Sequence, residues 1–152
     1  MNILIPILLV LAAFFFMEFM AWFTHKYVMH GFGWILHKDH HTREHYPFEW
    51  NDLFALIFAI PSIILIITGL PEYSAGFWIG IGIAMYGLAY FLFHDILVHQ
   101  RLPILNNIDN WYFRAIVRAH NDHHRGRKNY GFVLFIPWKY FRDESKPERG
   151  LY

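Results

Sequence analysis

Three long apolar runs, separated by short polar segments, dominate the first 93 residues of the chain. The runs cover residues 3–23, 53–70 and 75–93, and the first contains one charged residue, Glu18. A helix of about 21 residues rises about 1.5 Å per residue and reaches about 31 Å, close to the hydrocarbon thickness of a bilayer. The pattern therefore predicts three transmembrane helices.

The flanks of the runs carry signals for helix starts and for close packing. Asn51 and Asp52 are well placed to cap the second helix, and Pro61 predicts a kink within it. Small residues recur at four-residue spacing in the third run, which lets helix backbones approach closely in lipid. These residues are Gly76, Gly80 and Ala84. The first run lacks the basic start and the small-residue cleavage site of a signal peptide, so we expect a retained helix.

No stretch after the third run is long enough to span a membrane comfortably. Residues 108–119 have the pattern of an amphipathic helix, with an apolar face opposite two arginines. Residues 130–141 are apolar and aromatic but contain Pro137, so we expect them to lie against the membrane surface or to dip into it. A fourth, shallow span is the alternative. The charged tail from residue 142 is expected to be loose.

The thirteen lysines and arginines are confined to two stretches of the sequence. They lie between Lys26 and Arg43 or from Arg101 onward, and none lies between the second and third runs. With three spans, these two stretches share one side of the membrane, and the positive-inside rule assigns that side to the cytoplasm. With three spans, all eleven histidines fall on that same side.

The predicted architecture is an all-α membrane protein that forms a single domain over residues 1–152. Its three spans carry a helical, histidine-rich cytoplasmic cap formed by residues 24–51 and 94–141. The formal net charge of +1 gives no reason to expect nucleic-acid binding. The sequence has no cysteine, which excludes disulfides, thiolate zinc sites, iron–sulfur clusters and cysteine nucleophiles.

Ten of the eleven histidines form four groups in an alternating order, HxxxxH, HxxHH, HxxxxH and HxxHH. The groups are His25 and His30; His37, His40 and His41; His94 and His99; and His120, His123 and His124. A single HxxxxH carries little information at this histidine content, whereas two copies of HxxHH are rare by chance. The HxxHH groups are therefore the informative half of the pattern.

The spacings predict how the imidazoles point. On an α-helix, positions i, i+3 and i+4 share one face, so the three side chains of each HxxHH group should point the same way. Positions i and i+5 are about 140° apart on a straight helix and should diverge. Each HxxxxH group begins at the end of a span, so we expect it to straddle the membrane surface.

Ten imidazoles on one side of a small membrane domain indicate a metal centre, because a metal satisfies so many ring nitrogens directly. Ten nitrogen ligands exceed the four of one tetrahedral zinc, so at least two metal ions are predicted. Iron, zinc, copper and nickel all suit imidazole. Asp39, Asp95 and Asp122 lie inside the groups and are candidates for orienting the ligands, with solvated surface aspartates as the alternative.

Two further polar residues stand apart from the groups. Glu18 lies about 10 Å along the helix axis from His25 and should not touch it. An ionisable residue at membrane depth is a functional candidate, and helix packing, proton delivery and a substrate tunnel all remain open for Glu18. For His45, contacts with backbone or water are expected.

Several phrases around the histidines resemble bacterial-type β-carotene hydroxylases, a branch of the membrane fatty-acid hydroxylase and sterol desaturase superfamily. They are MEFMAWFTHKYVMHG, HKDHH, NDLFALIFA, FHDILVHQR and AHNDHH. The resemblance implies O2-dependent hydroxylation at C3 of carotenoid β-ionone rings, from β-carotene through β-cryptoxanthin to zeaxanthin. Canthaxanthin, converted to astaxanthin, is a further implied substrate. The bacterial inner membrane is the implied location.

The same resemblance implies that the ten motif histidines hold two iron ions, which zinc can replace in purified protein. A ferredoxin-type protein is the implied electron donor. A basic surface that includes Arg114, Arg118, Arg125, Arg127 and Lys128 is a candidate docking site for it, although positive-inside topology alone accounts for these charges. The oligomeric state stays open.

Other functions are compatible with the same features. Fatty-acyl or sterol hydroxylases and desaturases of the same superfamily are the nearest alternative, followed by a carotenoid ketolase. A metal transporter or store would carry ionisable residues along its spans, where this chain has only Glu18. A non-catalytic structural zinc protein is the remaining alternative.

Overall fold

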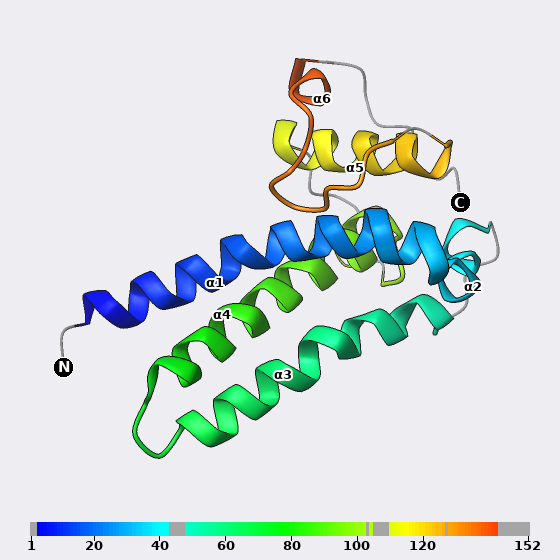
Figure 1. Ribbon diagram of the computed structural model, residues 1–152. Helices are drawn as coiled ribbons and strands as arrows, with labels where there is room; N and C mark the ends of the chain where they lie inside the picture. The colour runs from blue at the N-terminus through cyan, green and yellow to red at the C-terminus, as the bar shows by residue number, and fades with distance from the viewer. Residues whose placement is uncertain (1–2, 43–47, 103, 105–109, 127, 143–152) are drawn as a thin grey trace.

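The computed structural model describes residues 3–42, 48–102, 104, 110–126 and 128–142, and every regular element in them is helical (Figure 1). In chain order the elements are α1 (Leu4–Phe23), η1 (Thr24–Phe32), α2 (Trp34–His37), η2 (Asp39–His41), η3 (Trp50–Asp52), α3 (Leu53–Gly69), α4 (Ala75–Tyr90), η4 (Phe91–Val98), α5 (Trp111–His124) and α6 (Lys139–Arg142). The segments η1 and η4 are π-helices, whereas η2 and η3 are single 3₁₀ turns.

Three continuous helical stretches are long and apolar enough to cross a membrane, namely Leu4–Phe32, Trp50–Gly69 and Ala75–Val98. Apolar side chains cover their outer faces, such as Phe16 at 59% and Ile67 at 65% exposure. Such a surface suits lipid, because apolar side chains facing hydrocarbon leave no polar group without a partner. The three predicted spans are confirmed, and the first and third continue beyond their predicted ends as π-helices.

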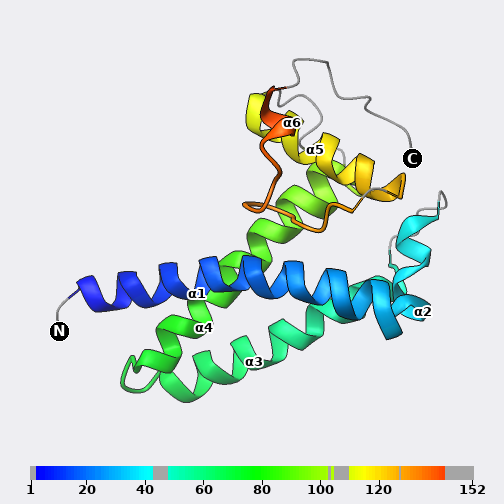
Figure 2. The same ribbon diagram turned by 45° about the horizontal axis from the view of Figure 1, so that its top comes forward.

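The histidine-bearing elements gather at one end of the bundle. The N-terminus and the turn between α3 and α4 lie at one end, while α2 and the far ends of α1 and α4 lie at the other (Figures 1 and 2). The basic residues Lys26 and Arg101 follow α1 and η4 at that second end. The shared location of the two basic stretches is therefore confirmed, whereas the assignment of that side to the cytoplasm stays a prediction.

Two glycines of α4 allow its backbone to approach both neighbouring spans. A Cβ at Gly80 would lie 2.9 Å from the carbonyl oxygen of Ser62 on α3. The hydroxyl of Ser62 donates to the carbonyl oxygen of Gly80 at 2.8 Å. A Cβ at Gly82 would lie 2.5 Å from the carbonyl oxygen of Val10 on α1. The prediction of close packing through small residues is thus confirmed at Gly80, and the contact with α1 uses Gly82 in addition.

Residues 129–136, here called the return segment, turn back from α5 and run among the spanning helices. Phe132 and Val133 share one buried apolar cluster with Met17, Ala21 and Tyr86. The segment forms no regular helix, and no fourth spanning helix occurs among the described residues. The alternative of a fourth span is therefore not found in this part of the chain, where the segment packs against α1 and α4.

The predicted amphipathic helix is observed as α5, which begins at Trp111 and includes the second HxxHH group. The side chain of Asn110 caps the helix by accepting the N–H of Phe113 at 2.9 Å. Ala115 and Ile116 are buried, as the apolar face requires. Helix α5 extends beyond the predicted end at residue 119, because the residues of the second HxxHH group continue the helical backbone hydrogen bonding as far as His124.

Replacing Gly82 with alanine is expected to destabilise the helix bundle. The added methyl group would overlap the backbone of α1, and overpacking of this kind costs about 1–3 kcal/mol. Gly87→Ala is the matched control, because a Cβ there meets nothing within 4 Å. Thermal unfolding in detergent should show a lower midpoint for Gly82→Ala than for Gly87→Ala, and equal midpoints would contradict the close contact.

Candidate metal centre

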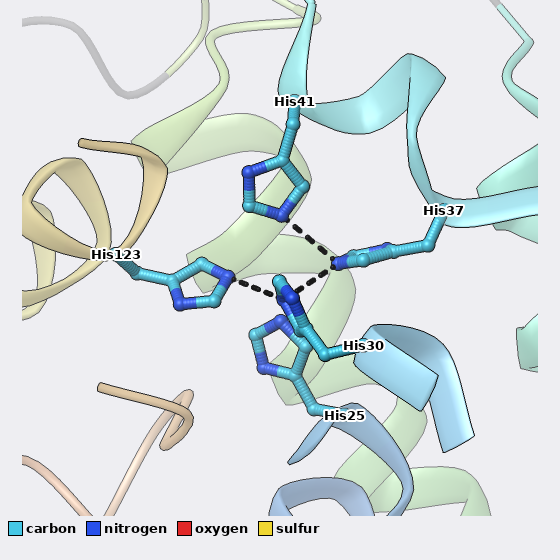
Figure 3. Close-up of side chains that lie close together, drawn as sticks. All are labelled: His25, His30, His37, His41 and His123. Carbon is cyan, nitrogen blue, oxygen red and sulfur yellow. Dashed lines mark hydrogen bonds between the residues drawn. The ribbon is translucent and has the colours of Figure 1, made fainter. Parts of the chain in front are cut away.

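Ten imidazoles converge at one end of the bundle, and nine of them form two compact groups. The first group contains His25, His30, His37, His41 and His123, and the second contains His40, His94, His99 and His120. Within each group, one ring nitrogen of every histidine lies within 4.8 Å of the others. Figure 3 shows the first group, in which rings from η1, the α2–η2 region and α5 point toward one another.

The tenth motif histidine, His124, lies between the two groups. Its ring centroid is 4.4 Å from that of His41 in the first group. Its Nε2 atom is 2.8 Å from Nε2 of His120 in the second group. All ten predicted ligands are therefore brought together.

Both HxxxxH pairs lie on the π-helical segments that continue the first and third spans. A π-helix hydrogen-bonds residue i+5 to residue i, so the two residues lie on the same face. The N–H of His99 donates in this way to the carbonyl oxygen of His94 at 3.0 Å. The ring centroids are 4.7 Å apart in this pair and 5.0 Å apart for His25 and His30. The prediction that these pairs diverge is wrong, because it assumed an α-helix.

The HxxHH groups do not point toward one site. His37 and His41 belong to the first histidine group, while His40 belongs to the second. On α5 the division is reversed, since His120 belongs to the second group and His123 to the first. Consecutive helical residues are about 100° apart, an arc wide enough to face two adjacent sites. The prediction of a single direction for each triplet is therefore wrong.

Each group takes most of its histidines from one half of the chain and one histidine from the other half. The exchanged residues are His40 and His123, and each is the middle histidine of its HxxHH triplet. The same correspondence matches His124 with His41 and assigns it to the second group, in agreement with its contact to His120. The two groups then contain five histidines each, with the same motif positions represented in both.

Four histidines direct Nδ1 toward an oxygen acceptor outside the groups. The pairs are His25 with the Tyr130 carbonyl at 3.2 Å, His37 with Asn51 Oδ1 at 2.7 Å, His40 with Glu49 Oε2 at 2.9 Å, and His94 with Asp95 Oδ1 at 3.2 Å. These oxygens only accept, so Nδ1 carries the proton and Nε2 keeps a lone pair. The arrangement is typical of metal-ligating histidines, whose second nitrogen is held by an oxygen.

The inner nitrogen atoms have the chemistry of a metal-binding set. Nε2 of His25 and Nε2 of His40 are buried without a hydrogen-bond partner among the described residues. Nε2 of His30 lies 3.0 Å from that of His123 and 3.2 Å from that of His37. Nitrogen ligands bind a metal at about 2.0–2.1 Å, which places neighbouring ligands about 3 Å apart. The donor atoms present therefore fit a shared metal ion in each group.

Burial keeps the imidazoles outside the spans neutral at ordinary pH. Desolvation is the largest cause, and neighbouring imidazoles lower the values further. The pKa falls to about 3 for His37, to about 4 for His41 and to about 2 for His123. Burial also lowers the pKa of His40, His120 and His124. Neutral imidazole is the form that binds a metal.

One arginine links the carboxylates that hold two histidines of the second group. Arg101 contacts Glu49 at 2.7 Å and Asp95 at 3.6 Å. Glu49 in turn accepts Nδ1 of His40, and Asp95 accepts Nδ1 of His94. A single guanidinium therefore fixes the orientation of two rings through their acceptors. Sequence reasoning did not single out Glu49 or Arg101.

The segment before α3 contributes more than a helix cap. Glu49 and Asp52 form a capping box, in which the N–H of Glu49 donates to Asp52 Oδ2 at 3.0 Å. Asn51 was predicted to cap the helix, but its side chain accepts Nδ1 of His37 instead. The E-x-x-D spacing of the capping box was the signal in the sequence that could have pointed to Glu49.

Two of the three candidate aspartates touch the histidine groups. Oδ1 of Asp95 lies 3.2 Å from Nδ1 of His94 and accepts its N–H. Asp39 accepts the backbone N–H groups of His40 at 2.9 Å and Trp50 at 2.7 Å. It therefore joins η2 to η3 and positions His40 through the backbone.

The third aspartate ties two helices together. Asp122 accepts the hydroxyl of Tyr140 at 2.8 Å, which links α5 to α6. Arg118, one of the basic residues on α5, donates to the carbonyl oxygen of Tyr140. His45 and Arg127 lie outside the described residues.

An apolar cavity of about 750 Å³ lies between the spans, and some of its lining residues contact histidines. Ile66 and Ile83 line it within the spans, and Tyr90 and Phe132 line it beside the histidines. The ring of Tyr90 stacks on His94 with centroids 4.5 Å apart. An apolar molecule in this cavity would therefore contact aromatic rings that touch the histidine groups.

Acid is expected to destabilise the metal-free protein. Unfolding exposes imidazoles with an ordinary pKa of 6.5, whereas His37 and His41 titrate near 3 and 4 in the fold. The unfolded chain therefore binds more protons between these values, and stability falls as pH drops below about 6.5. The cost is on the order of 1 kcal/mol per well-buried imidazole at pH 5.5. Melting midpoints in detergent at pH 7.5, 6.5 and 5.5 test this, and a flat profile would contradict it.

Loss of Arg101 is expected to weaken metal binding without removing a ligand. Arg101→Ala frees the carboxylates that orient His40 and His94. Mutating residues that hold metal ligands in place typically reduces metal affinity by about 10–100-fold. Lys38→Ala is the matched control, since Lys38 is an exposed cation at a variable position of the first HxxHH motif. Titration of the metal-free protein with Fe(II) or Zn(II) measures both, and equal affinities would rule out the orienting role.

Comparisons with known proteins agree with this site. A family model described as fatty acid hydroxylase matches residues 10–142. The β-carotene hydroxylase of Pseudescherichia vulneris is 47% identical over 134 residues, covering 88% of this chain and 74% of that protein. That of Pantoea ananas is 44% identical over 119 residues (78% and 68%), and that of Paracoccus sp. (strain PC1) is 37% identical over 145 residues (91% and 90%). No solved structure matches the chain. The chain therefore belongs to the fatty acid hydroxylase family, in its branch of bacterial-type β-carotene hydroxylases.

Proposed function

We propose that this chain hydroxylates carotenoid β-ionone rings at C3 with O2, at two iron ions held by its ten motif histidines. The observation that carries the proposal is the pair of histidine groups beside an apolar cavity between membrane-spanning helices, whose lining residues Tyr90 and Phe132 contact histidines. The substrate class comes from relatives named β-carotene hydroxylase, which include a protein 47% identical to this chain.

The cavity suits a substrate that is dissolved in the bilayer. A carotenoid ring can enter only from lipid, and the cavity is lined by α1, α3 and α4 at the depth of the spans. At the histidine end the ring would pack against Tyr90 and Phe132. These side chains place it next to both histidine groups and keep water away from the reacting carbon.

The reaction places one oxygen atom of O2 in a C–H bond as a hydroxyl group and releases the other as water, with two electrons and two protons consumed. Bound iron supplies the oxidising power that an unactivated C–H bond requires. The chain's own part is to present neutral imidazoles, which the lowered pKa values ensure, and to hold the rings through outer acceptors. Zinc, which also suits imidazole, would occupy the same sites in protein that has lost iron.

Hydroxylation of one ring gives β-cryptoxanthin from β-carotene, and hydroxylation of the second gives zeaxanthin. The same reaction on canthaxanthin gives astaxanthin. A substrate with two equivalent rings can present each end in turn to one cavity.

The electrons would come from a ferredoxin-type protein on the cytoplasmic side of the bacterial inner membrane. Helix α5 carries Arg114, Arg118 and, at its end, Arg125 next to the histidine groups. An acidic protein that docks on these basic residues would approach the metal ions from water, opposite to the lipid entry. Positive-inside placement of the same residues supports this orientation.

A fatty-acyl or sterol hydroxylase or desaturase is the second candidate function. It is favoured by the family description, fatty acid hydroxylase, and by a cavity whose lining is mainly apolar and would accept an acyl chain. The relatives named for β-carotene favour the ring substrate instead.

Expression in a β-carotene-producing bacterial host tests the function. The wild type should convert β-carotene to β-cryptoxanthin and zeaxanthin, as measured by chromatography of extracted pigments. His40→Ala and His123→Ala should reduce conversion to the level of the host alone, because each removes a nitrogen from one histidine group. Purified wild type should bind two iron ions per chain, and each variant fewer.

His45→Ala is the matched control, since this histidine lies outside the four motifs. It should retain wild-type conversion. Fatty-acid or sterol products without hydroxylated carotenoid would support the second candidate, and full activity in His40→Ala or His123→Ala would contradict the histidine-bound centre.

A further inference from the structure

A buried carboxylate within the first span has no part in the proposed ligand set. Glu18 is 0% exposed in α1. Its Oε1 accepts the backbone N–H groups of Phe132 at 3.2 Å and Phe135 at 2.9 Å, and the N–H of Val133 lies 3.2 Å from both carboxylate oxygens. The hydroxyl of Tyr86 donates to Oε2 at 2.8 Å. Glu18 therefore binds four donors, three of which belong to the return segment.

The return segment needs such an acceptor because it lies among spanning helices and has no regular backbone ladder of its own. Buried backbone N–H groups are almost always paired, and lipid offers them no partner. A tight turn also shapes the segment, since a Cβ at Gly131 would lie 2.0 Å from the carbonyl oxygen of Phe135. On the other side, the hydroxyl of Tyr112 on α5 donates to the carbonyl oxygen of Val133. The segment is thus held from both α1 and α5.

This anchoring fixes the position of one aromatic ring at the site. Phe132 stacks on His25, with ring centroids 4.6 Å apart and an interplanar angle of 23°. Its ring also meets His94 at 5.3 Å and Tyr90 at 4.8 Å, both edge to face. His25 belongs to the first histidine group and His94 to the second. Phe132 therefore touches both groups and also lines the apolar cavity.

We propose that Phe132 determines which carbon of a bound ring faces the histidine groups, and that Glu18 is the positioning residue that holds Phe132 in place. The inference rests on the proposed function for the identity of that ring, a carotenoid β-ionone ring. The ring packs against Phe132 at the end of the cavity, so this side chain limits how deeply and at what tilt the ring enters. A shorter side chain lets the ring rotate or advance, and the neighbouring methylenes C2 and C4 then reach the same oxidant.

A purely structural role for these residues makes a different prediction. If Glu18 and Phe132 only stabilise the bundle, their replacement lowers the amount of folded protein. The protein that does fold would still oxidise the same carbon. The position of the hydroxyl group on the ring therefore separates the two roles, whereas total activity does not.

The experiment compares the wild type, Phe132→Ala, Glu18→Gln and the double variant with Phe16→Ala as the matched control. Phe16 is an aromatic residue of the same helix as Glu18, 59% exposed on its outer face. Glutamine keeps the size of Glu18 but replaces one acceptor oxygen by an NH2 group that cannot accept a backbone N–H. Each chain is purified with its iron, and iron content, folded yield and pigment products are measured.

Phe132→Ala should keep the wild-type iron content while the C3 product per folded chain falls by about tenfold or more, the scale expected for a misplaced substrate. Alcohols at C2 or C4 should appear that the wild type does not make. Glu18→Gln should change the products in the same direction. The double variant should match Phe132→Ala alone, because Glu18 acts through Phe132. Phe16→Ala should give the wild-type products.

Unchanged product positions in Phe132→Ala would overturn the inference. Effects of Glu18→Gln and Phe132→Ala that simply multiply in the double variant would overturn the role of Glu18. If the wild type converts no carotenoid, the proposed function fails, and circular dichroism induced in β-carotene bound to purified protein then decides the inference. A wild-type signal that changes in Phe132→Ala but not in Phe16→Ala supports it, and an absent or unchanged signal overturns it.

Discussion

The rest of the structure depends on the convergence of ten imidazoles at one end of a small helical bundle. Neutral rings packed this closely are tolerated only if both nitrogens of each ring have a partner. The outer nitrogens of four rings are bound by a carbonyl, an amide and two carboxylates. Inner nitrogens of neighbouring rings, such as those of His30 and His37, lie 3.2 Å apart, the spacing of two ligands that share a metal ion. The fold brings the inner nitrogens together with two π-helical segments and with two HxxHH triplets that each contribute to both groups.

The histidine end of the bundle and its spanning helices obey the same physical rule, that a buried polar group needs a partner inside the protein. Arg101 pairs with the carboxylates that hold histidines of the second group, and Glu18 accepts backbone N–H groups of the return segment. Glycines in α4 let the spans approach closely on one level. Elsewhere the helices separate around the apolar cavity, whose lining includes aromatic rings in contact with histidines. The candidate metal centre and the apolar cavity therefore meet at Tyr90 and Phe132.

Much of this arrangement could be predicted from the sequence, and the failures have a common cause. The spans follow from apolar length, and the shared side of the histidines follows from the number of spans. The directions of the imidazoles were predicted wrongly because they depend on local helical pitch, and a stretch such as THKYVMHGF carries no pattern that distinguishes a π-helix from an α-helix. Likewise, Asn51 was predicted to be a cap, yet it binds His37, a partner that only the folded chain brings near.

The sequence by itself determined the membrane class, the number of spans, the ten candidate ligands and, through its motifs, the family. Those properties depend on residue type and on spacing along the chain. Tertiary structure decided which histidine joins which group, which residues orient the rings, and what Glu18 binds. These depend on contacts between residues as far apart as Glu18 and Phe135, and a distance in space between two such residues leaves no local trace in the sequence.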